Sequence, residues 1–249
     1  MNVSVFGSWA RPRVWSRVFD NLAQNTINYE IVVAGPVLPS FALPLNVTFI
    51  HCDPDPGPAV CAQLASKRCR GETMLVFNDD YVLSPYALDY AYDAYVRARD
   101  YKCMIHLIPG TGPLDNRIAS VLDQIVIPGS EHRWGFALWS RQVFLELGGF
   151  DRRCSVGAYE ADFMLRVYSQ GGRYVYASEA YILEDTSVAQ GVYAWNRDGC
   201  EETNAVVYAR WMSNGIRHGG YVLRKPRTSF EPIDDAVNVC VRDILVGGQ

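Results

Sequence analysis

The residues best placed to do chemistry are two adjacent carboxylates, Asp79 and Asp80, which follow Asn78. They come after an apolar run at residues 73–77, and an apolar run of this length predicts a strand buried on both faces. Ligands of open parallel sheets bind just outside the carboxyl ends of the strands. Two desolvated carboxylates repel each other unless a cation joins them, and a hard divalent ion with oxygen ligands would meet that need. The alternative is an ordinary surface turn, in which Asn and Asp are common.

A second group of charged residues lies in a helix predicted over residues 158–170. Asp162 and Arg166 are four residues apart and can pair on one helix face, which leaves Glu160 to point another way. We expect the helix dipole to keep a carboxylate in the first turn ionised, and such a group suits a general base for an alcohol. The alternative is that Glu160 only occupies a favourable position at the start of the helix.

The elements that must position these acids alternate between strand and helix in the first half of the chain. Such alternation predicts βαβ units and a parallel sheet. Strands are expected at residues 3–6, 29–34, 47–50 and 73–77, and helices at 12–22, 59–70 and 85–99. Because βαβ crossovers are right-handed, the strand ends that carry Gly7, Gly35, Asp53 and Asp80 should share one edge of the sheet.

The second half of the chain is less regular. A strand is expected at residues 103–108, and residues 136–139 lead through Ser140, a good N-cap, into a short helix that ends at Gly148-Gly149. Short strands around Tyr174 and Ile182 follow the acidic helix, and a further helix is expected at 202–213. No internal repeat or linker is found. We therefore predict one domain over residues 1–215, with halves of about 1–100 and 101–215, and an extension at 216–249 that packs on it or is partly mobile.

Composition narrows the class of protein. The 249 residues are 49% apolar and 20% charged, as in ordinary globular proteins, and the net charge of −4 argues against nucleic acid as a partner. No apolar segment is long enough to span a membrane, and the first residues lack the basic start of a signal peptide. The seven cysteines form no CxxC pair and are odd in number, so we expect a reducing, cytoplasmic location without a zinc site or disulfide framework.

Three short motifs, in this order, resemble the GT-A glycosyltransferases, especially the family 2-like inverting enzymes. The resemblance covers residues from about 1 to 215. The motifs are the strand and loop at residues 3–11, which in the family touches the nucleotide, the metal-binding acids at 78–80, and Gly148-Gly149-Phe150-Asp151 followed by an acidic helix start and an arginine. When the chain is aligned on Arg166, the family's catalytic Asp falls on Glu160.

The resemblance implies a single α/β GT-A-like domain with a mostly parallel central sheet flanked by helices. It implies metal-dependent transfer of a sugar, with inversion, from a nucleotide diphosphate donor such as a UDP-sugar to a hydroxyl of a glycan or another acceptor. The metal would be Mn²⁺ or Mg²⁺. The implied site residues are Glu160 and Asp162 for catalysis; Ser8, Arg11, Asp53, Gln63, Asn78, Asp79 and Arg197 for the donor; Asp80, Asp79 and Asp185 for the metal; and Trp134 and Trp139 for the acceptor.

The chain departs from the family pattern at three places. The family's base-binding Asp after the second strand is replaced by Ala34-Gly35-Pro36, and Asp53 at the end of the next strand is the candidate substitute. Asn78 replaces the first acid of the motif, so metal contact should fall chiefly on Asp80, with Asp79 aimed at the ribose or the sugar. Where a histidine often completes the metal site, this chain has Glu184-Asp185, which could also be a solvated turn.

Other functions stay open at this point. A sugar-phosphate nucleotidyltransferase also uses a parallel sheet and metal-binding acids, but the first loop lacks a Gly-rich, Arg-containing phosphate-binding sequence. A retaining glycosyltransferase could use the same scaffold. A nucleotide-sugar or carbohydrate-binding protein without turnover would also explain Asn78 and the missing Asp. Tryptophans such as Trp134 and Trp139 are more often core residues than sugar-stacking ones.

Overall fold

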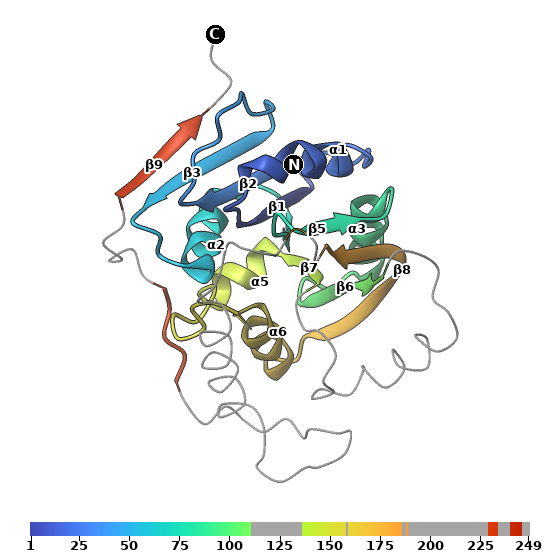
Figure 1. The fold of residues 1–249 in the computed structure, drawn as a ribbon. Coiled ribbons are helices and arrows are strands. Elements are labelled where there is room, and N and C mark those ends of the chain that lie inside the picture. The colour runs from blue at the N-terminus through green and yellow to red at the C-terminus, as the bar shows by residue number, and fades with distance from the viewer. Residues whose placement is uncertain (111–135, 158, 186–187, 189–228, 234–239, 246–249) are drawn as a thin grey trace, which may run out of the picture.

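The computed structural model describes residues 1–110, 136–157, 159–185, 188, 229–233 and 240–245. Nine strands are found in these ranges: β1 (Val3–Ser8), β2 (Tyr29–Gly35), β3 (Val47–Asp53), β4 (Thr73–Val76), β5 (Tyr81–Leu83), β6 (Cys103–Pro109), β7 (Ala137–Ser140), β8 (Arg173–Glu184) and β9 (Cys240–Leu245). They form one sheet in the order β5-β8-β6-β7-β4-β1-β2-β3-β9 (Figure 1).

The sheet is mostly parallel, as predicted. β1 runs parallel to both β2 and β4, β2 to β3, and β6 to β8. Three strands, β5, β7 and β9, run against their neighbours. The reversed β7 lies between β4 and β6 and joins the two halves of the chain into one continuous sheet. The carboxyl ends of β1, β2, β3 and β4 consequently lie at one edge, where the sequence places Asp53 and Asp80.

Helices cover both faces of the sheet. They are α1 (Trp15–Leu22), preceded by the 3₁₀ turn η1 (Pro12–Val14), α2 (Pro58–Ser66), α3 (Ala87–Ala98), α5 (Arg141–Glu146) and α6 (Tyr159–Ser169). Helices α1 and α3 pack on one face, and α2, α5 and α6 pack on the other. None of the helices in the described part of the chain combines the length and apolar character needed to cross a lipid bilayer.

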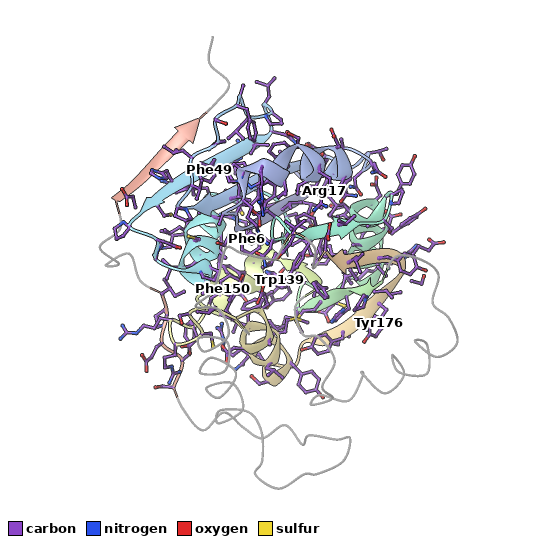
Figure 2. The ribbon with its side chains drawn as sticks, viewed as in Figure 1. Phe6, Arg17, Phe49, Trp139, Phe150 and Tyr176 are labelled. Atoms are coloured by element: carbon purple, nitrogen blue, oxygen red, sulfur yellow. The ribbon has the colours of Figure 1, made fainter. Side chains whose placement is uncertain are left out.

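The core follows from the alternation of side chains along the strands. In β1, Val3 and Val5 belong to the layer under α1 and α3, whereas Phe6 points to the opposite layer. There Phe6 lies 6.3 Å from Trp139 and 6.2 Å from Phe150, measured between ring centroids (Figure 2). Five cysteines of the described residues are buried in the core: Cys52, Cys61, Cys69, Cys103 and Cys154.

Several elements differ from the sequence prediction. Helix α2 ends at Ser66 rather than near Arg70. The two short strands expected around Tyr174 and Ile182 are one strand, β8, whose pairing with β6 shifts register between His106 and Ile108. Strands β5 and β9 were not predicted. The helix expected at 202–213 lies outside the described residues.

Candidate active site

The loop after β1 is held in place by Asp79. Oδ2 of this fully buried carboxylate accepts hydrogen bonds from the backbone N–H groups of Ala10 (3.0 Å) and Arg11 (2.7 Å) and from Nε1 of Trp15 (3.1 Å). Oδ1 accepts from Nε of Arg11 at 2.8 Å. Both oxygens of Asp79 are thus engaged by protein donors, and the side chain fixes the loop on the end of β4. This geometry gives Asp79 little capacity for the metal or the ribose.

Asp80 and Arg11 form the electrostatic centre of the site. Nη2 of Arg11 lies 2.7 Å from Oδ1 of Asp79 and 2.8 Å from Oδ2 of Asp80. The cation that two adjacent carboxylates require is therefore supplied, at least in part, by a protein side chain. Burial raises the pKa of the Asp80 carboxyl, and the positive charge of Arg11 opposes that rise. The sequence predicted that Arg11 binds the donor. In the structure its guanidinium is paired with Asp79 and Asp80.

Two oxygen atoms at the end of β4 fit a hard divalent ion. Oδ1 of Asp80 and Oδ1 of Asn78 are buried and have no hydrogen-bond partner within the described residues. A buried, unpartnered oxygen is costly, and hard cations such as Mg²⁺ or Mn²⁺ prefer oxygen ligands of this kind. No group of three or more His, Cys, Asp or Glu side chains suited to a metal occurs in the ranges described here. These two atoms can therefore supply only part of a coordination shell.

Asp185 lies beside Asp80 through the backbone. Its N–H donates to the carbonyl oxygen of Asp80 at 2.7 Å, so the end of β8 meets the acid-tipped end of β4. The side chain of Asp185 forms a short ion pair with Arg17 from α1. The expected position of Asp185 near the metal acids agrees with this placement, but its carboxylate is engaged by a cation from a different element.

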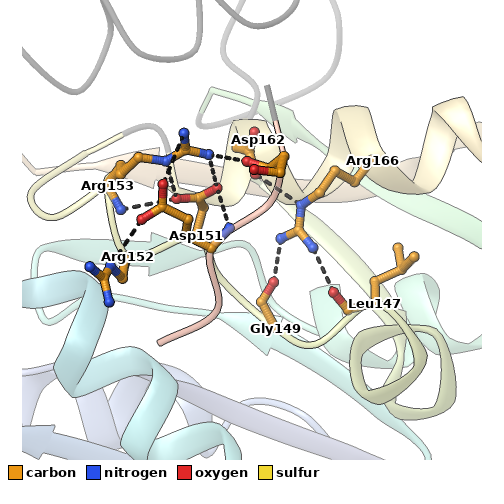
Figure 3. Close-up of polar contacts among 9 residues, drawn as sticks. Leu147, Gly149, Asp151, Arg152, Arg153, Asp162 and Arg166 are labelled. Carbon is orange, nitrogen blue, oxygen red and sulfur yellow. Dashed lines mark hydrogen bonds and ion pairs between the residues drawn. The ribbon is translucent and has the colours of Figure 1, made fainter. Parts of the chain in front are cut away.

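Arg166 joins helix α6 to the turn at Gly148 and Gly149, which we name the Gly-Gly turn. Nε of Arg166 donates to Asp162 at 2.9 Å, Nη1 donates to the carbonyl of Leu147 at 2.8 Å, and Nη2 makes a short bond to the carbonyl of Gly149 (Figure 3). The predicted pairing of Asp162 with Arg166 is therefore present. Asp162 is fully buried in this arrangement. We accordingly assign Asp162 to holding the helix against the turn, and not to the reaction itself.

Glu160 is the carboxylate left over on α6. It is 7% exposed, and burial raises its pKa to about 7, while hydrogen bonds from its own backbone N–H and from the Tyr159 hydroxyl oppose the rise. We expected the helix dipole to keep Glu160 ionised. In the structure, the effect of burial, which favours the protonated carboxyl, is larger than that of the dipole. The Tyr159 hydroxyl also interacts with the side chain of Asn78. The first turn of α6 consequently faces the end of β4.

Two predicted binding residues belong to the interior instead. Gln63 is buried on α2, and its Oε1 accepts from the N–H of Phe150 at 3.0 Å, so it braces the Gly-Gly turn and does not face a donor. Gly149 has φ +77°, and a Cβ there would collide with the Gln63 amide. Trp139 on β7 is fully buried, with its ring 4.8 Å from that of Phe163, so the structure places it in the core and not at a surface where an acceptor could stack on it.

The remaining predicted donor residues are spread along the sheet edge. Ser8 ends β1 and is buried, whereas Asp53 ends β3 and is exposed. Three strand spacings separate β3 from β4, so Asp53 ends a strand that lies about 14 Å across the sheet from the strand that precedes the acids. A Cβ at Gly35 would overlap the carbonyl oxygen of Trp9, so the position of the family's base-binding Asp is filled by backbone. Trp134 and Arg197 lie outside the described residues.

No protein-family model and no curated protein matches the chain. Among solved structures, it matches residues 1–349 of TarS from S. aureus with a TM-score of 0.53 and 15% identity, over 82% of this chain and 71% of that one. It matches the mannosyltransferase PcManGT from Pyrobaculum calidifontis with a TM-score of 0.57 and 14% identity, over 82% and 73%. The chain has the GT-A glycosyltransferase fold.

A third GT-A structure, that of GalNAc-T7, matches with a TM-score of 0.58 and 11% identity, over 86% of this chain but 48% of the other. The matched structures include TarS in complex with UDP-GlcNAc, PcManGT in complex with GDP-Man and Mn²⁺, and GalNAc-T7 with UDP, GalNAc and Mn²⁺. At these identities the likeness establishes the GT-A fold of this chain, and its chemistry must be argued from its own residues.

Sequence reasoning missed two residues that shape the site. Arg17 pairs with Asp185 across 168 positions of sequence, and no local pattern indicates such a contact. Tyr159 directly precedes Glu160, and its hydroxyl contacts both Glu160 and Asn78. In the alignment on Arg166, Tyr159 stands where the family's motif has an acid, and this difference could have drawn attention to it.

Proposed function

We propose that this chain is a metal-dependent glycosyltransferase that moves a sugar from a nucleotide diphosphate donor, with a UDP-sugar as the first candidate, to an acceptor hydroxyl with inversion. The observation that carries the proposal is the placement of Glu160. A buried carboxylate with a pKa of about 7 lies in the first turn of α6, next to Tyr159, whose hydroxyl interacts with the side chain of Asn78. The GT-A fold and the use of nucleotide sugars by its structural neighbours support the same assignment.

On the donor side, Asp80 and Asn78 would hold Mn²⁺ or Mg²⁺ through their unpartnered Oδ1 atoms. The ion, when bound, supplies positive charge that stabilises the departing diphosphate. Arg11 adds a fixed guanidinium beside Asp80, within the same part of the site. Asp79 contributes by holding the Ala10–Arg11 backbone in place.

On the acceptor side, the Glu160 carboxylate removes the proton from the acceptor hydroxyl. The acceptor oxygen then forms a bond to the anomeric carbon while the bond between that carbon and the diphosphate oxygen breaks. The nucleoside diphosphate leaves with the bonding electron pair, and attack from the opposite side inverts the configuration. A general base is most effective when its pKa lies near the working pH, and Glu160 meets that condition.

The test uses UDP- and GDP-sugars with Mn²⁺ or Mg²⁺, with release of nucleoside diphosphate as the readout. We expect metal-dependent release that a chelator stops, slow with water and faster with an acceptor glycan. Glu160→Gln should keep donor binding and lose at least about a hundredfold in rate, in line with the usual contribution of a general base. Asp80→Asn should lose the metal-dependent release of nucleoside diphosphate. Glu146→Gln, an exposed carboxylate on α5, is the matched control and should keep wild-type rates.

A near wild-type rate for Glu160→Gln would remove the base assignment. Retention of the anomeric configuration, read by NMR of the product, would replace the inverting mechanism with a retaining one. Release of pyrophosphate from a nucleoside triphosphate would instead identify a nucleotidyltransferase.

A binding protein without turnover is the second candidate, and the Arg11 contacts favour it. A guanidinium that already offsets part of the negative charge of Asp79 and Asp80 would let a nucleotide bind without a metal. Thermal stabilisation by UDP in the presence of a chelator, with no turnover of any donor when Mn²⁺ is added, would support this candidate over the enzyme.

A further inference from the structure

A short C-terminal segment, Ser229–Ile233, lies against the turn that precedes α6; we name it the 229–233 strap. Its backbone pairs with the turn in an antiparallel bridge between Asp151 and Pro232. The N–H of Arg152 donates to the carbonyl of Glu231 at 2.9 Å, and the N–H of Ile233 donates to the carbonyl of Phe150 at 3.4 Å. The strap is thus attached to Phe150, Asp151 and Arg152, directly after Gly149, from a distance of about eighty residues in sequence.

Side chains reinforce this attachment. Arg153 forms an ion pair with the fully buried Asp151 at 2.8 Å, donates to the carbonyl of Ser229 at 2.6 Å and lies 3.4 Å from the carboxylate of Glu231. Glu231 also pairs with Arg152 at 3.1 Å. Oδ2 of Asp151 accepts from the N–H of Glu231 at 3.3 Å. Figure 3 shows these contacts side by side with those of Arg166.

The strap also contacts the arginine that holds α6. The ring of Phe230 covers the guanidinium of Arg166, with 4.1 Å between Cζ and the ring centroid, and Phe163 lies 5.4 Å from the same guanidinium. Gly148 admits this ring, because a Cβ there would come within 2.9 Å of Phe230. Arg166 is therefore covered by an aromatic ring from the strap while it bonds to the turn and to Asp162.

Two short routes lead from the strap to Glu160. Phe150, to which Ile233 is bonded, packs edge-on against Tyr159 with 4.8 Å between ring centroids, and Tyr159 precedes Glu160. Arg166 lies six residues after Glu160 on one helix, a rise of about 9 Å along a stiff rod. The first route ends at the first turn of α6, and the second reaches that turn through the rigid helix.

We propose that the 229–233 strap is a positioning element for Glu160, with Phe230 as its principal positioning residue. The inference rests on the proposed function, since it concerns the base of that reaction. Strap contacts hold α6 and the Gly-Gly turn as one unit, and this fixes the distance from Glu160 to the acid-tipped end of β4. A displacement of about 1 Å at a catalytic group can cost on the order of a hundredfold in rate.

The experiment compares Phe230→Ala with Phe230→Tyr, which keeps a ring over Arg166. Tyr92→Ala is the matched control, because Tyr92 is a half-buried aromatic on α3 that packs 6.2 Å from Tyr95 in the other core layer. We expect Phe230→Ala to lower kcat for nucleotide-sugar turnover by about tenfold or more with donor KM within twofold, and Phe230→Tyr to restore most of it. Tyr92→Ala should keep kcat.

Hydrogen exchange read by mass spectrometry gives a second measurement that does not depend on turnover. Amides of the first turns of α6 should exchange at least about tenfold faster in Phe230→Ala, whereas those of α3 keep their rates. An unchanged kcat with unchanged α6 exchange would overturn the proposal, as would an equal loss of kcat in Tyr92→Ala. If the wild-type protein turns over no nucleotide sugar, the proposed function fails, and the α6 exchange rates alone decide whether the strap holds this helix.

Discussion

Replacing Glu160 with glutamine should change how protein stability depends on pH. Burial raises the pKa of Glu160 from 4.5 to about 7, so the folded state holds a proton that the unfolded state has already lost between these two values. Stability from this group is fully present below pH 4.5, falls as pH rises towards 7, and stays low above that. The whole shift corresponds to about 3 kcal/mol, and most of it is lost between pH 5 and pH 8.

Glutamine does not titrate, so Glu160→Gln should lack this loss. Urea unfolding of both proteins at pH 5 and pH 8 gives the free energy of unfolding in each case, and shifts from other titrating groups cancel in the comparison. We expect the wild type to lose about 2–3 kcal/mol more than the variant between the two pH values. Glu146→Gln controls for the removal of one negative charge. Equal losses in wild type and Glu160→Gln would refute the argument that burial sets the ionisation of Glu160.

Substitutions at three further positions test the architecture around the site by urea unfolding at pH 7. Asp79→Ala should destabilise the fold by about 3–5 kcal/mol, because it leaves Arg11 and two backbone donors without their buried acceptor, and a loss below 1 kcal/mol would contradict this. Gly149→Ala should cost about 2–4 kcal/mol, because φ is +77° and the new methyl group meets Gln63; an unchanged stability would show that the turn can relax. Ser140→Ala should cost about 1 kcal/mol through loss of the α5 N-cap, and Ser140→Asp should recover it.

The sequence predicts well those features that depend on the periodicity of apolar residues and on the order of strands and helices along the chain. Apolar runs and turn residues locate β1 to β4, and right-handed crossovers then bring Asp53 and Asp80 to one edge of the sheet. The four-residue spacing of Asp162 and Arg166 predicts their ion pair on α6. Ser140 is recognisable as an N-cap because the apolar run ends immediately before it.

The features that pattern cannot predict are those set by distant partners. Nothing near Arg11 in sequence indicates that Asp79 and Asp80 will take its guanidinium, since the contact spans almost seventy positions. Gln63 resembles a polar helix residue open to a ligand, and only the packed turn shows that it is used by Phe150. Trp139 is equally ambiguous, because an aromatic residue beside a predicted site can stack on a sugar or fill a core.

Strand β9 has a consequence for handling the protein. It pairs with β3 along six residues, from Thr48 to Asp53, and thereby covers what would otherwise be an open strand edge. A version shortened at residue 215 would bare the N–H and C=O groups of β3 to neighbouring molecules, and a bare edge of this kind promotes intermolecular pairing and aggregation. A shortened version that precipitates would therefore report on this uncovered edge of β3, and not on the packing of residues 1–110.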